Sequence, residues 1–199
     1  MKKLCFRYGA MNAAKTMNLL TVNYNCKELG LKTVIVVPNC IPDKKVKSRV
    51  GIEADAIYIS ELEEFLNNNK VDYVLVDEVQ FLNKQEIELL SRVSIEGITV
   101  ITYGLRTASN GELFEGAKWL LAWADEIEEI PTSCKCGRKA RMNLRFVDGK
   151  VDTSNEVVKL RSEQQVAYVS VCRECYFKYY NEIEDAAELI KYDNTITCK

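Results

Sequence analysis

Residues 9–16 read Gly-Ala-Met-Asn-Ala-Ala-Lys-Thr, and this stretch decides the fold. Phosphate-binding loops follow the pattern G-x-x-x-x-G-K-[ST] between a strand and a helix. Gly9, Lys15 and Thr16 stand at the required spacing, and Ala14 replaces the second glycine. The stretch therefore predicts a site for the phosphates of a nucleoside triphosphate. A chance Gly and Lys-Thr pair at a strand-helix joint is the alternative.

The flanks of the loop support the first interpretation. Leu4–Tyr8 reads as a buried strand, and Lys15–Leu29 contains neither Gly nor Pro and places apolar residues on one helix face. In such loops the backbone N–H groups and the helix N-terminus point at the phosphates. The Lys15 ammonium would contact the β- and γ-phosphates, and the Thr16 hydroxyl would bind Mg²⁺. The methyl group of Ala14 is expected to weaken or reshape phosphate binding rather than abolish it.

Strand and helix patterns alternate through the first two-thirds of the chain, which predicts an α/β fold with a doubly wound parallel sheet. Nearly continuous apolar strands such as Val71–Val76 are typical of parallel strands covered on both faces. The other expected strands are Leu4–Tyr8, Thr33–Val37, Ile98–Tyr103 and Glu126–Ile130. The expected helices are Lys15–Leu29, Glu61–Asn68, Lys84–Val93 and Gly116–Ala124, and residues 38–51 read as a loop.

The composition excludes several classes of protein. The chain has 199 residues, 47% of them hydrophobic and 28% charged, as in an ordinary soluble globular protein. Its net charge of -2 gives no reason to expect nucleic acid or a membrane surface as a partner. No apolar run reaches the length of a membrane span. Because the first expected strand begins within a few residues of Met1, we expect no signal peptide. We therefore expect a cytoplasmic protein. Because the chain has no histidine, we also expect no His-based catalysis and no His ligand on a metal.

The stretch Val74-Leu75-Val76-Asp77-Glu78 is an apolar strand that ends in two acids. Asp77 at the carboxyl end of a strand can hold Mg²⁺, directly or through water. Glu78 can serve as a general base toward a hydroxyl group or a water molecule. The alternative is that both acids cap the next helix, whose N-terminus favours negative charge. Together with the phosphate loop, the pair favours phosphoryl transfer.

Four of the eight cysteines form two close pairs, Cys134 with Cys136 and Cys172 with Cys175. Four thiolates can enclose a structural Zn²⁺ ion tetrahedrally, leaving no position for water. Two disulfides or four ordinary thiols are the alternatives, and a reducing cytosol argues against disulfides. We predict a phosphate-loop α/β domain over residues 1–131 and a small zinc-binding domain over residues 132–199. The second contains a hairpin turn at residues 147–150 and a helix from about Tyr176 to Tyr192.

Further motifs extend the pattern in one order along the chain: Asp77–Phe81, Tyr103–Thr107, Gly111–Phe114, Cys136–Ala140 and Tyr168–Arg173. Together with the phosphate loop and the cysteine pairs, they resemble the zinc-containing (type II) thymidine kinases over nearly the whole chain. The resemblance implies a phosphate-loop fold with a zinc-binding lasso domain. It also implies that the γ-phosphate of ATP is transferred to the 5′-hydroxyl of thymidine, which serves deoxynucleoside salvage, and that the chain forms a homotetramer.

The resemblance also assigns roles to individual positions. It makes Glu78 the catalytic base, Thr16 and Asp77 the Mg²⁺ residues, and the four paired cysteines the ligands of a structural Zn²⁺ ion. Arg106 would lie near the phosphates. The residues expected to bind ATP are Gly9, Ala10, Met11, Asn12, Ala13, Ala14, Lys15, Thr16, Asp77 and Gln80. The residues expected to surround the nucleoside are Met11, Phe81, Phe114 and Tyr168.

The chain departs from the family pattern mainly in segments expected near the nucleoside. Pro42-Asp43-Lys44 stands where the family usually has Asp-x-Arg, and Ala108–Gly111 lacks an aromatic residue that is common there. In the family, Ile-Gly-Gly normally precedes the tyrosine of the lasso, the loop that closes over the nucleoside. Tyr168 matches that tyrosine, but residues 160–167 contain no glycine. A homologue that retains the fold and binds nucleotide, with altered nucleoside preference or no turnover, is therefore the alternative. A phosphate-loop hydrolase that does not act on nucleosides is a third hypothesis.

Overall fold

The computed structural model describes residues 3–153, 166–181 and 189, and the chain divides into two compact units. The first unit comprises residues 1–8, 14–106 and 114–130. The second comprises residues 9–13, 107–113 and 131–199. The predicted domain boundary after residue 131 stays a prediction. The sequence places residues 9–13 and 107–113 in the first domain, whereas in the structure both segments group with the C-terminal part.

The first unit contains a six-stranded parallel sheet with the strand order β5-β2-β6-β7-β1-β8. This arrangement confirms the predicted α/β fold. The sheet contains all five expected strands, of which β2, β6, β7 and β1 lie at its centre and β8 lies at one edge. Its strands are β1 (Leu4–Tyr8), β2 (Thr33–Val37), β5 (Ile57–Tyr58), β6 (Tyr73–Val76), β7 (Thr99–Gly104) and β8 (Glu126–Glu129).

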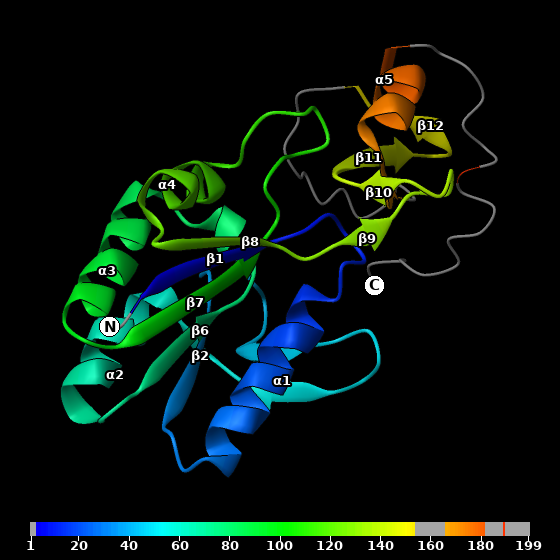
Figure 1. Cartoon of the computed structure of the whole chain (residues 1–199). Coiled ribbons are helices and arrows are strands. Elements are labelled where there is room, and N and C mark those ends of the chain that lie inside the picture. The colour runs from blue at the N-terminus through cyan, green and yellow to red at the C-terminus, as the bar shows by residue number, and fades with distance from the viewer. Residues whose placement is uncertain (1–2, 154–165, 182–188, 190–199) are drawn as a thin grey trace. The chain divides into compact units, whose positions relative to one another are not determined.

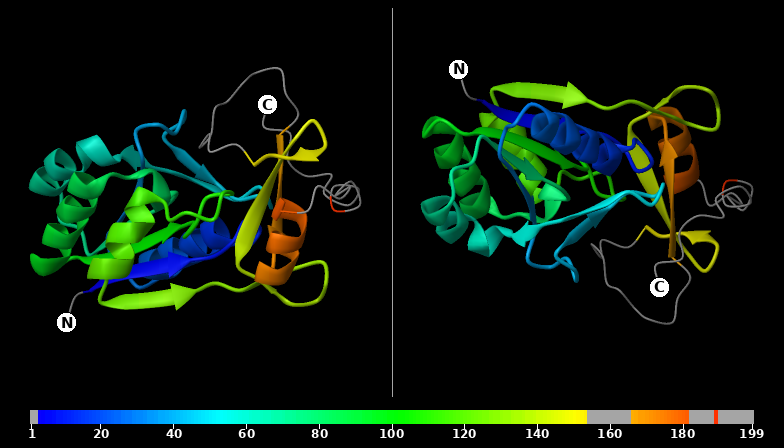
Figure 2. Two further views of the ribbon diagram at one scale, coloured as in Figure 1. Left: turned by 90° about the horizontal axis from the view of Figure 1, so that it is seen from above. Right: turned by 90° about the horizontal axis from the view of Figure 1, so that it is seen from below.

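Helices cover both faces of this sheet (Figure 1 and Figure 2). Alternate strand residues point to opposite faces, so Phe6 packs with α2, α3 and α4 whereas Cys5 packs with α1. The helices of this unit are α1 (Lys15–Glu28), α2 (Leu62–Asn68), α3 (Lys84–Ile95) and α4 (Glu115–Trp123), with 3₁₀ turns η1 (Ile59–Glu61) and η2 (Val79–Phe81). None of the helices in the described parts of the chain is long and apolar enough to cross a membrane.

The structure corrects the prediction that residues 38–51 form a loop. This stretch contains β3 (Lys45–Lys47), which pairs antiparallel with β4 (Glu53–Asp55). Only Val46 in β3 is buried, and a three-residue strand is too short to show a period in the sequence. The buried Val46 side chain joins the core on the α1 side of the sheet, which fixes the hairpin to the unit.

The second unit contains small antiparallel sheets and one described helix. Strand β11 (Met142–Val147) lies between β12 (Lys150–Val151) and β13 (Val166–Val171), and the turn at residues 147–150 is confirmed. Strands β9 (Thr132–Ser133) and β10 (Lys139–Ala140) form a second pair. The final helix begins earlier than predicted, as α5 (Arg173–Asn181). Of the remainder of the predicted helix, only Leu189 lies within the described residues.

The turn η2 is enclosed by its neighbours so closely that only glycine fits beside it at two positions. A Cβ atom on Gly104, at the end of β7, would lie 2.5 Å from the Gln80 side-chain oxygen and 2.8 Å from the Val79 side chain. A Cβ atom on Gly116, in the first turn of α4, would collide with the Val79 carbonyl oxygen. The side chains of Val79 and Gln80 are consequently buried, with 0% and 2% exposed.

We predict that Gly116→Ala destabilises the first unit by about 1–3 kcal/mol, because the added methyl group must displace η2 or α4. Urea denaturation followed by far-UV circular dichroism measures the loss. Lys118→Ala, on the exposed side of the same helix, is the matched control and should leave the unfolding midpoint nearly unchanged. Equal midpoints for Gly116→Ala and the unaltered protein would contradict the close packing described for η2.

Candidate functional site

The start of α1 and the end of β6 bring Thr16 and Asp77 together in the first unit. The Thr16 hydroxyl donates a hydrogen bond of 2.9 Å to Oδ2 of Asp77, whose side chain is almost fully buried. A threonine from the phosphate loop and an aspartate from the end of a strand are the pair that holds Mg²⁺ in phosphate-loop proteins. The oxygen donors and their proximity fit that ion.

The electrostatics of the site favour a bound cation. Burial and the negative charge of Glu78 raise the pKa of the Asp77 carboxyl to about 7, although Thr16, the Glu78 N–H and Lys15 each lower it. Burial lowers the pKa of the Lys15 ammonium, which the charges of Glu78 and Asp77 only partly oppose. Both shifts reflect the unfavourable burial of charge. A divalent cation beside Asp77 would favour its charged form.

Glu78 adopts a left-handed backbone conformation between β6 and η2, with φ 52° and ψ 35°. Its N–H donates to Oδ1 of Asp77 at 3.1 Å, and its carboxylate accepts a hydrogen bond of 2.6 Å from Nε2 of Gln80. Non-glycine residues rarely adopt this conformation, and such strain is concentrated at functional sites. The backbone conformation turns the chain sharply directly after Asp77.

The alternative that these two acids cap the next helix is wrong. The side chain of Glu78 makes no capping hydrogen bond to η2. Helix α3 has its own cap, in which the Asn83 side chain accepts from the Glu86 N–H at 3.0 Å and Glu86 accepts from the Asn83 N–H at 2.8 Å. Asp77 and Glu78 are thus not needed for starting a helix.

Ala14, which replaces the second glycine of the loop pattern, also has a left-handed backbone, with φ 54° and ψ 29°. Glycine adopts this conformation without a steric penalty, whereas other residues pay roughly 1–2 kcal/mol. Alanine carries the smallest side chain that has this penalty. The local turn of the loop is therefore kept, and the Ala14 carbonyl accepts the first helical hydrogen bond, from the Asn18 N–H at 2.9 Å.

Loop residues 9–13 belong to the second unit, where polar side chains hold their backbone. The Met11 N–H donates to Oδ1 of Asn143 at 2.8 Å, and the Ser170 hydroxyl donates to the Met11 carbonyl. Asn143 on β11 and Ser170 on β13 are paired in the sheet register, and both are buried. Neither contact was predicted from the sequence. Asn143 lies outside the quoted motifs, and Ser170 lies within the Tyr168–Arg173 motif, in which only Tyr168 and Cys172 were assigned a role.

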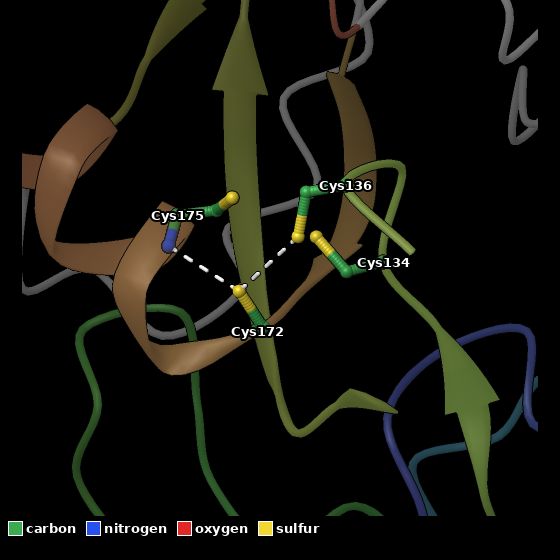
Figure 3. A group of neighbouring side chains, drawn as sticks. All are labelled: Cys134, Cys136, Cys172 and Cys175. Atoms are coloured by element: carbon green, nitrogen blue, oxygen red, sulfur yellow. Dashed lines mark hydrogen bonds between the residues drawn. The ribbon is translucent and has the colours of Figure 1, made fainter. Parts of the chain in front are cut away.

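The four paired cysteines converge in the second unit (Figure 3). Cys134 and Cys136 lie in the turn between β9 and β10, Cys172 follows β13, and Cys175 lies in the first turn of α5. All four Sγ atoms lie within 4.8 Å of one another, and those of Cys136 and Cys172 are 3.6 Å apart. Four sulfurs at 2.3 Å from a tetrahedral Zn²⁺ ion would be about 3.8 Å apart. The arrangement fits such an ion.

The alternative of two disulfides is wrong for this cluster, whose cysteines are all free and whose sulfur separation exceeds the S–S bond length of about 2 Å. Burial raises the pKa of the Cys172 thiol, but hydrogen bonds from the Cys175 N–H and the neighbouring thiols outweigh it and bring the pKa to about 7. Thiolates are the form that binds metal. Cys5 and Cys26 are buried in the first unit as expected, and Cys198 lies outside the described residues.

The four residues expected around the nucleoside are divided between the units. Phe81 and Phe114 belong to the first unit, where their rings meet edge to face at 5.8 Å and Phe81 remains 37% exposed. Met11 and Tyr168 belong to the second unit, and Tyr168 lies on β13 opposite Arg145 of β11. Residues 160–165, which lack the family's glycines, lie outside the described residues.

Comparison with known proteins settles the relationship that these motifs suggest. A sequence profile described as thymidine kinase matches residues 2–176. The chain belongs to the thymidine kinase family. It is 41% identical over 194 residues to a thymidine kinase of Photorhabdus laumondii, which covers 92% of this chain and 96% of that protein. It is 44% identical over 189 residues to a thymidine kinase of Haemophilus influenzae, covering 87% and 95%.

Among solved structures, the RuvB Holliday junction branch migration motor of Thermotoga maritima matches 66% of this chain and 38% of its own. The TM-score is 0.39 and the sequence identity 17%, so this likeness adds nothing to the thymidine kinase assignment. The family assignment confirms the resemblance drawn from the motifs. It also removes the hypothesis of a phosphate-loop hydrolase that does not act on nucleosides.

The left-handed backbone at position 14 yields a prediction for ATP binding. Ala14→Val should raise the KM for ATP at least about 10-fold, because a β-branched residue cannot adopt a left-handed backbone without severe strain. Ala14→Gly should bind ATP at least as well as the unaltered protein, because glycine removes the strain. Steady-state kinetics at varied ATP concentration measures both. Equal KM values for the Val and Gly variants would contradict the account.

The cysteine cluster predicts one Zn²⁺ ion per chain. Cys172→Ser should abolish zinc binding and lower the thermal midpoint, because a structural metal contributes directly to folding. Metal analysis by inductively coupled plasma mass spectrometry and thermal unfolding measure the two effects. Cys40→Ser, at an exposed cysteine outside the cluster, is the control and should keep the full zinc content. Zinc-free protein with an unchanged midpoint would contradict the assignment.

Proposed function

We propose that this protein is a thymidine kinase that transfers the γ-phosphate of ATP to the 5′-hydroxyl of thymidine and so serves deoxynucleoside salvage. The observation that carries the proposal is that the hydrogen-bonded pair Thr16 and Asp77 lies next to Glu78, whose carboxylate accepts a hydrogen bond from Gln80. Phosphoryl transfer depends mainly on positioning and charge stabilisation. A hydroxyl acceptor additionally needs a base, and Glu78 supplies one beside the metal-binding pair.

The phosphate loop, residues 9–16, is the proposed site for the ATP phosphates, with the Lys15 ammonium on the β- and γ-phosphates. Thr16 and Asp77 would hold Mg²⁺, which stabilises the charge that develops on the transferred phosphoryl group. Arg106 is also proposed to lie near the phosphates. Its guanidinium lies over the Tyr8 ring, 5.4 Å from the centroid, and Tyr8 is the last residue of β1 before the phosphate loop.

Glu78 is the proposed catalytic base. Its carboxylate accepts the proton of the 5′-hydroxyl as the oxygen attacks the γ-phosphorus, and the bond from that phosphorus to the β-phosphate oxygen breaks. ADP leaves with the bonding electron pair, and the proton passes from Glu78 to solvent. The tight backbone turn at Glu78 suits this role, because it restricts the positions that the carboxylate can occupy.

Recognition of thymidine is the part of the proposal for which the chain departs most from the family pattern. Met11, Phe81, Phe114 and Tyr168 are proposed to surround the nucleoside, and the partly exposed edge-to-face pair of Phe81 and Phe114 supports this. The segment 107–113 lacks an aromatic residue, and it is fixed by a hydrogen bond of 2.7 Å from the Tyr176 hydroxyl to the Ser109 carbonyl. This departure favours altered nucleoside preference as the second candidate function.

The remaining assignments are proposals that rest on the family. We propose that the four-cysteine cluster binds structural Zn²⁺, that the protein acts in the cytoplasm, and that it assembles as a homotetramer. Neither nucleic acid nor a membrane is a proposed partner. Light scattering of the zinc-replete protein tests the assembly, for which a mass of one chain would be the contradicting result.

We predict that Glu78→Gln lowers kcat for thymidine by about 10²–10⁴-fold, the usual contribution of a general base. The KM for ATP should change little, because the amide keeps the size of the side chain. A coupled assay of ADP release with thymidine, deoxyuridine, deoxycytidine and purine deoxynucleosides measures turnover and preference together. Glu64→Gln, at an exposed position of α2, is the control.

The outcomes of this assay separate the two candidates. Zinc-replete protein that releases ADP with thymidine supports the proposed function. Release with another nucleoside alone supports altered preference, and no release with any nucleoside supports a homologue without turnover. A Glu78→Gln variant as active as the unaltered protein would overturn the assigned base while leaving the kinase activity in place.

A further inference from the structure

The side-chain amide of Gln80 joins Glu78 to the end of strand β7. Its Nε2 donates a hydrogen bond of 2.6 Å to the Glu78 carboxylate, and its Oε1 accepts one of 3.0 Å from the Leu105 N–H. We propose that Gln80 is a positioning residue, which fixes the Glu78 carboxylate for proton transfer and does not itself contact ATP. This proposal rests on the proposed function, because it takes Glu78 to be the catalytic base.

The chemistry of the two neighbours determines which way round the amide lies. The Leu105 N–H can only donate, so the amide oxygen must face it. The ionised Glu78 carboxylate can only accept, so the amide nitrogen must face that side. Only a side chain with a donor at one end and an acceptor at the other satisfies both neighbours. Glutamine has this property, whereas glutamate and methionine do not.

The surroundings hold Gln80 in place from two sides. Gly104 precedes Leu105, and any side chain there would lie 2.5 Å from the Gln80 oxygen, so the glycine permits the close approach of β7. Gly116 of α4 lies against the backbone, where an added Cβ atom would be 3.3 Å from the Gln80 Cα atom. With 2% of the residue exposed and both ends of the amide engaged, Gln80 is poorly placed to bind a nucleotide.

The hydrogen bond is needed because a glutamate side chain has several rotatable bonds and Glu78 is only half-buried. Hydrogen bonds to an ionised group are short and about twice as strong as neutral ones, and the separation of 2.6 Å from Nε2 of Gln80 agrees with that class. A catalytic group displaced by about 1 Å can lose 10²-fold in rate. Losing the amide should therefore reduce turnover without removing the base.

The test uses Gln80→Met, which keeps nearly the same volume and loses both hydrogen bonds. With zinc-replete full-length protein, kcat for thymidine should fall about 10–100-fold, while the KM for ATP changes less than about threefold. Leu82→Val, in the buried residue that follows η2, is the matched control for a merely loosened segment and should keep kcat within about threefold. Gln80→Asn, whose shorter amide cannot reach both partners, is a second variant should Gln80→Met fail to fold.

A double-mutant cycle with Glu78→Gln decides whether Gln80 acts through Glu78. If it does, adding Gln80→Met to Glu78→Gln should produce no further loss of kcat beyond about twofold, measured with radiolabelled ATP over long incubations. A full additional loss in that background, an unchanged kcat in Gln80→Met, or a loss confined to the KM for ATP would overturn the proposal. Unaltered protein without nucleoside-dependent turnover would overturn the proposed function itself, and this role with it.

Discussion

The close packing of β7 and α4 around η2 is the constraint on which the rest of the site depends. Gly104 and Gly116 allow the two elements to approach η2 more closely than any residue with a side chain would. The chain between Val76 and Val79 must then turn within two residues, and Glu78 accepts a left-handed backbone to do so. The strain at Glu78 is thus balanced by the burial of Val79 and Gln80.

The same turn determines the electrostatics of the site. It places two carboxylates in sequence at the carboxyl end of β6, where Asp77 is buried against the Thr16 hydroxyl and Glu78 is directed to Gln80. The two acids have different environments. Asp77 accepts hydrogen bonds from the Thr16 hydroxyl and a backbone N–H, whereas Glu78 accepts one from the side-chain amide of Gln80. Distinct environments allow adjacent acids to take distinct roles, one toward a metal ion and the other toward a proton.

Much of the fold could be predicted from sequence, because the parallel strands are continuous apolar runs and the loop at residues 9–16 follows a spaced pattern. Strand β3 could not, since Lys-Val-Lys offers only one buried side chain. The paired cysteines revealed the cluster because metal ligands come in short spacings. Asn143 and the link from Gln80 to Leu105 left no such trace, because they depend on which strands become neighbours in space.

The most direct test of the central claim, phosphoryl transfer to a nucleoside hydroxyl assisted by Glu78, is the fate of the γ-phosphate. Zinc-replete protein is incubated with ATP labelled at the γ-phosphate and with thymidine, and the products are separated by chromatography. We expect the label to be recovered in thymidine 5′-monophosphate. Label released as inorganic phosphate, with thymidine unchanged, would contradict it.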